Sequence, residues 1–255
     1  MDHGFTVGDG VFETLKVVDG TPFAPSRHIR RLRRSASLLG LADLDPELVA
    51  AAMADAVAAN ADQLGDNGRL RVTYTSGEGP LGSDRGDGPG TLLAVATPGA
   101  AWPATAAIVT VPWPRNERGP LAGVKSTSYA ENAMALAHAK LRGASEGVLA
   151  NTQGELCEGT GSNVFIVRNG QILTPPLASG CLAGITRELV LEWFDVREET
   201  MAIADLETVD EVFLTSSTRD VHPVSRVDDR ELQVPQVSGE LARQFVERAA
   251  ADLDP

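Results

Sequence analysis

Hydrophobic and polar positions along the first part of the chain predict a strand followed by two helices. Residues 11–18 are rich in β-branched and aromatic strand formers and are followed by an Asp-Gly turn. In residues 26–40 apolar side chains recur at helical spacing up to a glycine, which is typical of an amphipathic helix. An Asp-Pro-Glu sequence predicts the start of a second helix over residues 45–65. Further strands are predicted at 70–75, 91–97 and 106–111.

The second half of the chain combines helical periodicity with short runs typical of an antiparallel meander. Helices are predicted over residues 128–141, 185–194 and 239–251. Strands are predicted at 147–151, 163–168, 171–174 and 211–215, with turn sequences between several of them. Because the strands cluster without regular βαβ alternation, the pattern favours an α+β fold in two domains.

The boundary between the two domains is predicted at a proline-rich stretch without periodicity. Residues 113–121 fall in this stretch, which is typical of an interdomain linker. We therefore expect a small N-terminal α/β domain over residues 1–112 and a larger C-terminal domain over residues 122–255.

Composition and charge narrow the possible partners. The 255 residues are 43% hydrophobic and 22% charged, which is ordinary globular usage and excludes collagen-like and disordered chains. The net charge of −13 repels phosphodiester backbones and anionic membranes, so we expect no nucleic-acid partner. No apolar stretch reaches bilayer length, so we expect a cytoplasmic protein without a membrane partner. Cys157 and Cys181 lack the spacing of a zinc site or a disulfide framework, and no metal is expected.

Two local patterns invite a functional interpretation, and the context excludes only the first of them. Residues 77–82 match the GxGxxG pattern, but Pro80 and the glycine-rich run after it forbid the helix that a dinucleotide site needs. A loop near a functional site is the better interpretation. Five arginines between residues 27 and 34 form the densest basic run, which is typical of either a solvated helix face or a local anion site.

Lysine is scarce, which limits the candidates for amine chemistry. The three lysines are Lys16, Lys125 and Lys140. Lys16 lies in a predicted strand, and Lys140 lies in the last turn of a predicted helix, where a cation suits the helix dipole. Lys125 lies between the linker and a helix, where an amine can face a cleft between two domains. Lysine is the side chain that condenses with an aldehyde to give a Schiff base.

Several motifs together closely resemble the class IV aminotransferases, the fold-type IV enzymes that use pyridoxal 5′-phosphate. The most specific block runs from Glu158-Gly-Thr-Gly-Ser-Asn163 to Gly184-Ile-Thr186-Arg187. The resemblance also covers Gly8-Asp-Gly-Val-Phe-Glu-Thr14, His28-Ile-Arg-Arg31, Lys125 and Leu214-Thr-Ser-Ser217. It implies a small α/β domain and a larger domain with an antiparallel pseudo-barrel sheet. Family members generally have two further short strands before the first of these motifs.

The resemblance implies roles for individual residues. Lys125 would carry the cofactor as a Schiff base and shuttle a proton. Glu158 would keep the pyridine nitrogen protonated, so that the ring accepts electrons. Tyr129, taken as one helical turn from Lys125, would hydrogen-bond the phenolic oxygen of the cofactor.

The phosphate of the cofactor would need oriented donors and a positive charge. Ile185 and Thr186 follow a glycine at a predicted helix start, where backbone amides can hold an anion. Ser216 and Ser217 end a predicted buried strand and would add hydroxyl donors. Arg31 would supply the charge-assisted contact, which leaves the other arginines of its run solvated or structural.

The implied reaction is a ping-pong transamination between an amino donor and a 2-oxo acid acceptor, carried out by a homodimer. Thr14 after the glutamate resembles the D-amino acid transaminase and 4-amino-4-deoxychorismate lyase branches of the family. A D-amino acid (or R-amine) transaminase is therefore the leading interpretation. The alternatives are the lyase, an L-branched-chain aminotransferase, and a non-catalytic relative that has kept the fold. Arg71 or Arg85 would bind the substrate carboxylate.

Overall fold

A computed structural model describes residues 1–255, which divide into two compact units. The first unit consists of residues 1–101, 124–129 and 252–255. The second unit consists of residues 102–123 and 130–251. Each unit has its own sheet and its own core.

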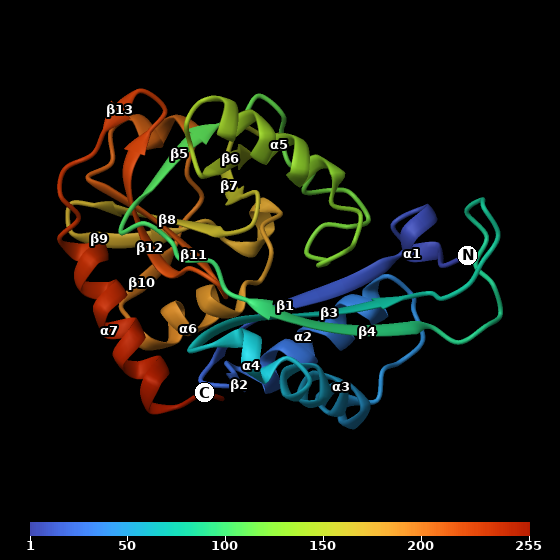
Figure 1. The fold of residues 1–255 in the computed structure, drawn as a ribbon. Helices are drawn as coiled ribbons and strands as arrows, with labels where there is room; N and C mark the ends of the chain where they lie inside the picture. Colours follow the sequence, from blue (N-terminus) through green and yellow to red (C-terminus); the bar gives the residue numbers. More distant parts are fainter. The chain divides into compact units, whose positions relative to one another are not determined.

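The first unit is an antiparallel sheet with three of its four helices on one face (Figure 1). Its strands are β1 (Gly10–Val18), β2 (Thr21–Pro22), β3 (Asn67–Thr75) and β4 (Thr91–Pro98), in the order β2-β1-β3-β4. Its helices are α1 (His3–Thr6), α2 (Pro25–Leu38), α3 (Pro46–Ala58) and α4 (Ala61–Leu64). Asp45 caps α3 through its side chain, as predicted, because its carboxylate accepts a hydrogen bond from the Glu47 amide at 2.9 Å.

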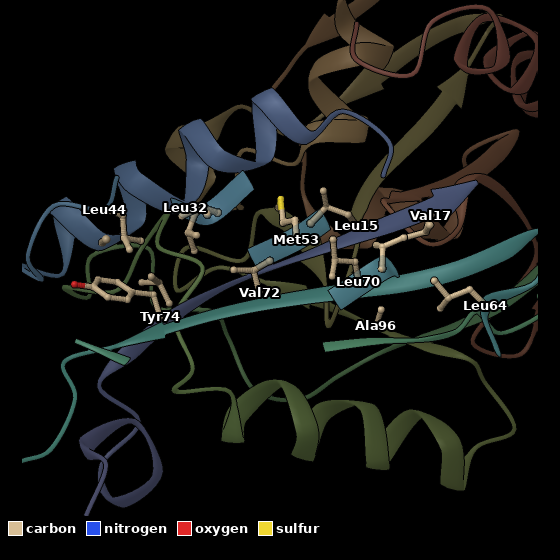
Figure 2. Close-up of a cluster of buried hydrophobic side chains, with 14 residues drawn as sticks. Leu15, Val17, Leu32, Leu44, Met53, Leu64, Leu70, Val72, Tyr74 and Ala96 are labelled. Carbon is tan, nitrogen blue, oxygen red and sulfur yellow. The ribbon is translucent and has the colours of Figure 1, made fainter. Parts of the chain in front are cut away.

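The core of the first unit lies between this sheet and helices α2 and α3. Leu15 and Leu70 of the sheet and Leu32 of α2 are completely buried, and Met53 of α3 packs in the same cluster (Figure 2). The strands alternate these inward side chains with outward ones such as Phe12, since successive residues of a strand point to opposite faces. The side chains on the outward face of β1 and β3 therefore do not belong to this core.

Two segments distant in the sequence complete the first unit. Residues 124–129 lie along β1, where Val11 bridges to Ser126 and the Phe12 amide donates to the Lys125 carbonyl at 2.9 Å. Residues 252–255 lie at the start of α2. There the Asp254 carboxylate accepts a hydrogen bond from the Ser26 amide at 3.0 Å, which caps a helix whose N-cap residue, Ala24, offers no side-chain acceptor.

The second unit is built on one larger sheet. Its strands are β5 (Ala106–Thr110), β6 (Glu146–Ala150), β7 (Leu156–Gly159), β8 (Asn163–Arg168), β9 (Gln171–Thr174), β10 (Val196–Glu198), β11 (Glu211–Ser216), β12 (Asp220–Val227) and β13 (Arg230–Glu231). They follow the order β10-β9-β8-β11-β12-β5-β6-β7, with β13 paired to β12. Its helices are α5 (Ala130–Leu141), α6 (Ile185–Trp193) and α7 (Val237–Ala251), with short 3₁₀ turns η1 (Leu177–Ser179) and η2 (Ile203–Glu207).

This sheet is mixed, whereas the sequence led us to expect an antiparallel one. The pairs β12–β5, β5–β6 and β9–β10 are parallel. Two parallel neighbouring strands need a long connection between them. The chain between β5 and β6 meets this condition, since it contains α5. The core includes the stacked rings of Phe165 and Phe213, whose centroids lie 4.7 Å apart.

The observed division differs from the predicted domains at residues 102–112, 124–129 and 252–255, and the predicted linker, residues 113–121, belongs to the second unit. Residues 102–112 belong to the second unit, because β5 pairs with β6 and β12. Residues 124–129 belong to the first unit, and with them Lys125, which we had placed in the C-terminal domain. Tyr129 is also not one helical turn from Lys125, since α5 begins only at Ala130 and residue 126 pairs with β1.

No helix of the structure has both the length and the apolar character needed to cross a membrane.

Candidate active site

In the first unit, the Lys125 amine lies against an aromatic ring on the outward face of β1. Its Nζ is 4.5 Å from the centroid of the Phe12 ring. The Arg71 guanidinium, on β3, lies 3.8 Å from the same centroid, and the Tyr129 ring meets Phe12 edge-on at 5.3 Å. One phenylalanine therefore gathers a lysine, an arginine and a tyrosine at one place on the sheet.

Arg71 belongs to this cluster because of strand register. Thr14 is its partner on β1, so Phe12 is its diagonal neighbour on the same face. Its side chain is partly withdrawn from water, and this burial lowers the pKa of the guanidinium, while Tyr129 raises it. Arg71, one of the two predicted substrate residues, is thus placed in the same cluster as the predicted catalytic lysine.

Arg31 lies on the inward side of β1 and is part of a buried charged triad. Its Nε and Nη2 donate to the two carboxylate oxygens of Glu13 at 2.8 and 2.6 Å. His28 Nδ1 lies 2.6 Å from the same carboxylate. Burial raises the pKa of Glu13, but the charge and hydrogen bonds of Arg31, followed by those of His28, outweigh it and hold the pKa at about 2. Glu13 therefore fixes the guanidinium that we predicted as the phosphate ligand.

Arg85, the other predicted substrate residue, is committed to structural contacts. Its Nε and Nη2 donate to the Asp9 carboxylate at 2.7 and 2.6 Å. Its Nη1 and Nη2 also donate to the carbonyls of Gly40 and Leu39 at 2.9 Å. These bonds tie the loop between β3 and β4 to the end of α2. Since all three nitrogens have protein partners, the geometry does not support a substrate role for Arg85. The GxGxxG match lies in this loop and forms no helix, as predicted.

In the second unit, the Glu158 carboxylate is held from two sides. Its Oε2 accepts a hydrogen bond from the Leu182 amide at 2.9 Å, and its Oε1 accepts one from Arg115 Nε at 3.2 Å. The side chain is 13% exposed. A carboxylate fixed in this way is oriented to pair with a cationic group such as a protonated ring nitrogen.

Asn163 connects the remaining predicted cofactor residues. Its side-chain amide donates to the Leu182 carbonyl at 2.8 Å, and an added Cβ on Gly184 would meet its Oδ1 at 2.0 Å. Gly184 is the N-cap of α6 and has no side chain that could cap the helix. The N–H groups of Ile185 and Thr186, the first two residues of α6, can therefore donate to another acceptor. Only a glycine fits this close approach.

The same asparagine lies beside the hairpin that carries the predicted serines. Asn163 pairs with Thr215 of β11, and Ser216 and Ser217 follow directly. The Thr215 hydroxyl is buried without a hydrogen-bond partner. The structure therefore brings both the start of α6 and the end of β11 next to Asn163, and Glu158 binds the loop before α6 through the Leu182 amide.

These residues fit pyridoxal 5′-phosphate. The amides of Ile185 and Thr186 at a helix start, with the nearby hydroxyls of Ser216 and Ser217, are an anion-binding donor set. Glu158 matches a protonated nitrogen, and the amine of Lys125 matches an aldehyde. Lys125, Tyr129 and Arg31 belong to the first unit, and Glu158, Ile185, Thr186, Ser216 and Ser217 belong to the second unit.

Phe12, Glu13 and Arg115 were not among the predicted site residues. Phe12 and Glu13 lie inside the Val-Phe-Glu-Thr motif, so the motif was the available signal, although it did not reveal that they hold Lys125 and Arg31 in place. Arg115 lies in the stretch that we predicted as a linker, and nothing in its local sequence connects it with Glu158.

Comparison with known proteins identifies the family. The sequence profile described as amino-transferase class IV matches residues 10–227. A protein of Methanocaldococcus jannaschii, provisionally named a branched-chain-amino-acid aminotransferase, is 36% identical over 97% of this chain and 88% of its own length. A bifunctional aminodeoxychorismate lyase / D-amino acid transaminase of Mycobacterium tuberculosis is 30% identical over 88% of this chain and 84% of its own length.

Solved structures agree with the sequence relatives. A fold IV transaminase from Curtobacterium pusillum has a TM-score of 0.88 at 29% identity, and the match covers all of this chain and 88% of the other. A hypothetical aminotransferase from Mycobacterium tuberculosis in its PLP-bound form has a TM-score of 0.85 at 29% identity, over 97% of this chain and 91% of the other. The predicted α+β fold of type IV in two domains is confirmed. The chain belongs to the class IV aminotransferases, enzymes that use pyridoxal 5′-phosphate to pass an amino group from a donor to a keto acid.

Proposed function

We propose that this enzyme is a transaminase that moves an amino group from a D-amino acid to a 2-oxo acid at Lys125. The observation that carries the proposal is the position of the Lys125 amine, 4.5 Å from the Phe12 ring and in the same cluster as Arg71. When bound, pyridoxal 5′-phosphate supplies an aldehyde that condenses with amines and a ring that accepts electrons from the reacting carbon. Lys125 would then serve as the base that takes the proton from the α-carbon of the donor and, in the second half-reaction, as the acid that delivers a proton to the α-carbon of the new amino acid.

Glu158 and the donors of the second unit hold the cofactor in this proposal. The Glu158 carboxylate keeps the ring nitrogen protonated, and its bonds to Leu182 and Arg115 keep it in one orientation. The amides of Ile185 and Thr186 and the hydroxyls of Thr186, Ser216 and Ser217 bind the phosphate. Arg31, held by Glu13, neutralises the phosphate charge, and Tyr129 donates to the phenolic oxygen.

The substrate carboxylate is assigned to Arg71. A guanidinium is suited to bidentate carboxylate binding, and Arg71 lies against the same ring as the Lys125 amine, whereas Arg85 is tied to Asp9. Replacing Arg71 with Ala is expected to raise KM for both the donor and the 2-oxo acid by about 10- to 100-fold, because a charge-assisted contact is lost.

The D-amino acid preference rests on Thr14 and on the relatives whose names include D-amino acid transaminase. Two other candidates have specific support. The name of the Methanocaldococcus relative favours L-branched-chain donors, and the name of the Mycobacterium relative favours aminodeoxychorismate lyase activity. The three candidates differ in the first substrate that they convert, so one experiment separates them.

The experiment adds single substrates to the cofactor-loaded enzyme without an acceptor. D-alanine is expected to bleach the visible band of the bound cofactor and to release stoichiometric pyruvate. Bleaching by L-leucine alone would instead assign the branched-chain activity. Sustained pyruvate and 4-aminobenzoate release from aminodeoxychorismate alone, without response to D-alanine, would assign the lyase.

A lysine substitution tests the chemistry itself. Lys125→Ala is expected to abolish the visible band of the bound cofactor and to lower turnover by at least about 100-fold, since proton transfer by a positioned side chain is lost. Lys140→Ala, at an exposed position in the last turn of α5, is the matched control and should keep the wild-type rate. Wild-type turnover in the Lys125 variant would contradict the assignment.

We also propose that the enzyme acts as a homodimer, as its family resemblance implies. Sedimentation equilibrium is expected to give about twice the chain mass of 26.9 kDa. A mass equal to one chain at micromolar concentration would contradict the dimer.

A further inference from the structure

Glu146, at the start of β6, buries its carboxylate beneath the turn that follows Glu158. The hydroxyl of Thr160 donates to its Oε1, and the hydroxyl of Ser162 donates to its Oε2 at 3.3 Å. The side chain is only 3% exposed. An added Cβ on Gly159 would come within 3.2 Å of the Glu146 side chain, so the turn packs directly on this carboxyl group. Hydrogen bonds to Glu146 and packing against its side chain therefore hold the turn formed by residues 159–162 in place.

The same carboxylate is paired with an arginine from the hairpin between β11 and β12. Arg219 Nη2 lies 3.3 Å from Glu146 Oε2 and donates to the Ser145 carbonyl at 3.0 Å. Arg219 is two residues beyond Ser217, and its amide donates to the Ser216 carbonyl at 3.2 Å, which closes the hairpin turn. Its side chain is 6% exposed, and the guanidinium lies 3.9 Å from the Trp102 ring centroid. The arginine thus anchors the tip of the hairpin to the body of the second unit.

We propose that Glu146 and Arg219 are positioning residues that fix the spacing between the Glu158 turn and the Ser216–Ser217 hairpin. This inference rests on the proposed function, which assigns Glu158 to the ring nitrogen and the serines to the phosphate. The carboxylate binds one segment through hydroxyl groups and the other through an ion pair. The two ends of the cofactor are a fixed distance apart, so a rigid link between their binding segments improves the fit to both.

The link depends on charge as well as shape. Burial lowers the pKa of the Arg219 guanidinium, and the neighbouring Glu146 opposes this effect. Arg219 Nη1 has no hydrogen-bond partner, so its charge is compensated mainly through Nη2. If Glu146 is replaced by Gln, a buried guanidinium is left without its counter-ion, and the hairpin has to move for the charge to reach water.

The test compares pyridoxal 5′-phosphate with pyridoxal, which lacks the phosphate. Apoprotein carrying Glu146→Gln or Arg219→Gln is titrated with each compound, and binding is followed by the absorbance of the bound cofactor. Both variants are expected to bind the phosphorylated compound about 10- to 100-fold more weakly. Pyridoxal binding should change less, so the preference for the phosphorylated compound should fall. The double variant should be no weaker than the weaker single variant, because the two residues act as one unit.

Two further variants separate positioning from general destabilisation. Glu211→Gln removes another buried carboxylate of this unit, one that accepts hydrogen bonds from the amides of residues 236–238 at the start of α7. It should keep the wild-type preference. Arg219→Lys retains a cation and should recover most of the preference that Arg219→Gln loses.

The outcomes are distinct. An unchanged preference in both Glu146→Gln and Arg219→Gln, or an equal loss in Glu211→Gln, would overturn the positioning role. Failure of the proposed function would show instead in the Lys125→Ala variant, which would then keep the visible band of the bound cofactor and the wild-type turnover.

Discussion

Glu13 binds the guanidinium of Arg31, the predicted phosphate ligand, through two hydrogen bonds. Its carboxylate is completely buried and bonds to both Arg31 and His28. Burial lowers the pKa of His28, with Arg31 and Lys125 acting in the same direction, while Glu13 raises it. A carboxylate and a guanidinium can be buried together because their charges compensate each other. Removing one of them leaves the other charge buried without compensation, which destabilises the fold.

The pH dependence of stability follows from the depressed pKa of Glu13. Its folded pKa of about 2 lies below its ordinary value of 4.5. The unfolded chain therefore binds the proton first as pH falls, and this pair stabilises the protein fully above pH 4.5. The contribution is lost progressively as pH falls from 4.5 towards 2.

Replacing Glu13 with Gln is expected to lower the free energy of unfolding by about 3 kcal/mol at pH 7, because the Arg31 charge stays buried without its partner. Urea unfolding at pH 7 and at pH 3 measures this, and the difference from wild type should shrink at the lower pH. Glu78→Gln, at a side chain that is 88% exposed, is the control. A difference that grows on acidification would contradict the sign of the pKa shift.

At the scale of elements, the loop before α6 places the helix start against Asn163. Leu182 is bound on both sides, by Glu158 through its amide and by Asn163 through its carbonyl. Gly184 then passes so close to Asn163 that no side chain fits. The contacts of this loop therefore set the position of the first amides of α6.

A methyl group at position 184 tests this arrangement. Gly184→Ala is expected to weaken binding of pyridoxal 5′-phosphate by about 100-fold, since its Cβ would displace Asn163 and with it the helix start. Gly161→Ala is the matched control, because an added Cβ there meets nothing within 4 Å. Cofactor titration of both apoproteins measures the effect, and equal affinities in the two variants would show that the close approach is not needed.

Elements with a strong local pattern were predictable from the sequence. Strands β8 and β9 match their predicted ranges, and β1 and β11 match to within a residue at either end. By contrast, β12 was not predicted, because Pro223 and mixed polarity weaken its strand pattern. Its position is set by pairing with β11 and β5, which are not local in sequence.

The site shows the same division between local and distant information. Lys125 and Glu158 were recognisable because they belong to motifs, and the structure places each in a defined environment. Glu146 has no such signal, since its partners Thr160, Ser162 and Arg219 become neighbours only when the sheet forms. Likewise, the bonds that occupy Arg85 come from two other segments of the chain.

On the scale of the whole molecule, the excess of acidic residues is the dominant property. There are 35 acidic and 22 basic side chains, which gives the net charge of −13. Like charges over one compact surface repel each other and destabilise the folded state at low salt. The ion pairs described above are local attractive contacts in a molecule whose surface charges mostly repel each other.

Salt is therefore expected to stabilise the protein. Raising NaCl from 0.01 to 0.15 M shortens the Debye length from about 30 to about 8 Å. We expect Tm at pH 7.5 to rise by about 2–4 °C, the shift that about 1 kcal/mol produces in a chain of this size. Scanning calorimetry at both salt concentrations measures it. At pH 4.7, near the isoelectric point, the same step should have a smaller effect. A Tm that falls with salt at pH 7.5 would show that ion pairs outweigh repulsion.

The capping of α2 by Asp254 has a consequence for the order of events during synthesis. The helix begins at residue 25, yet the carboxylate that closes its first turn is translated only after the entire second unit. At ordinary elongation rates the interval is on the order of ten seconds. Residues 124–129, which also belong to the first unit, are translated within the same interval. The N-terminal half is thus completed only after the second unit has been translated, and a ribosome-bound chain stalled before residue 252 would display α2 with an open first turn.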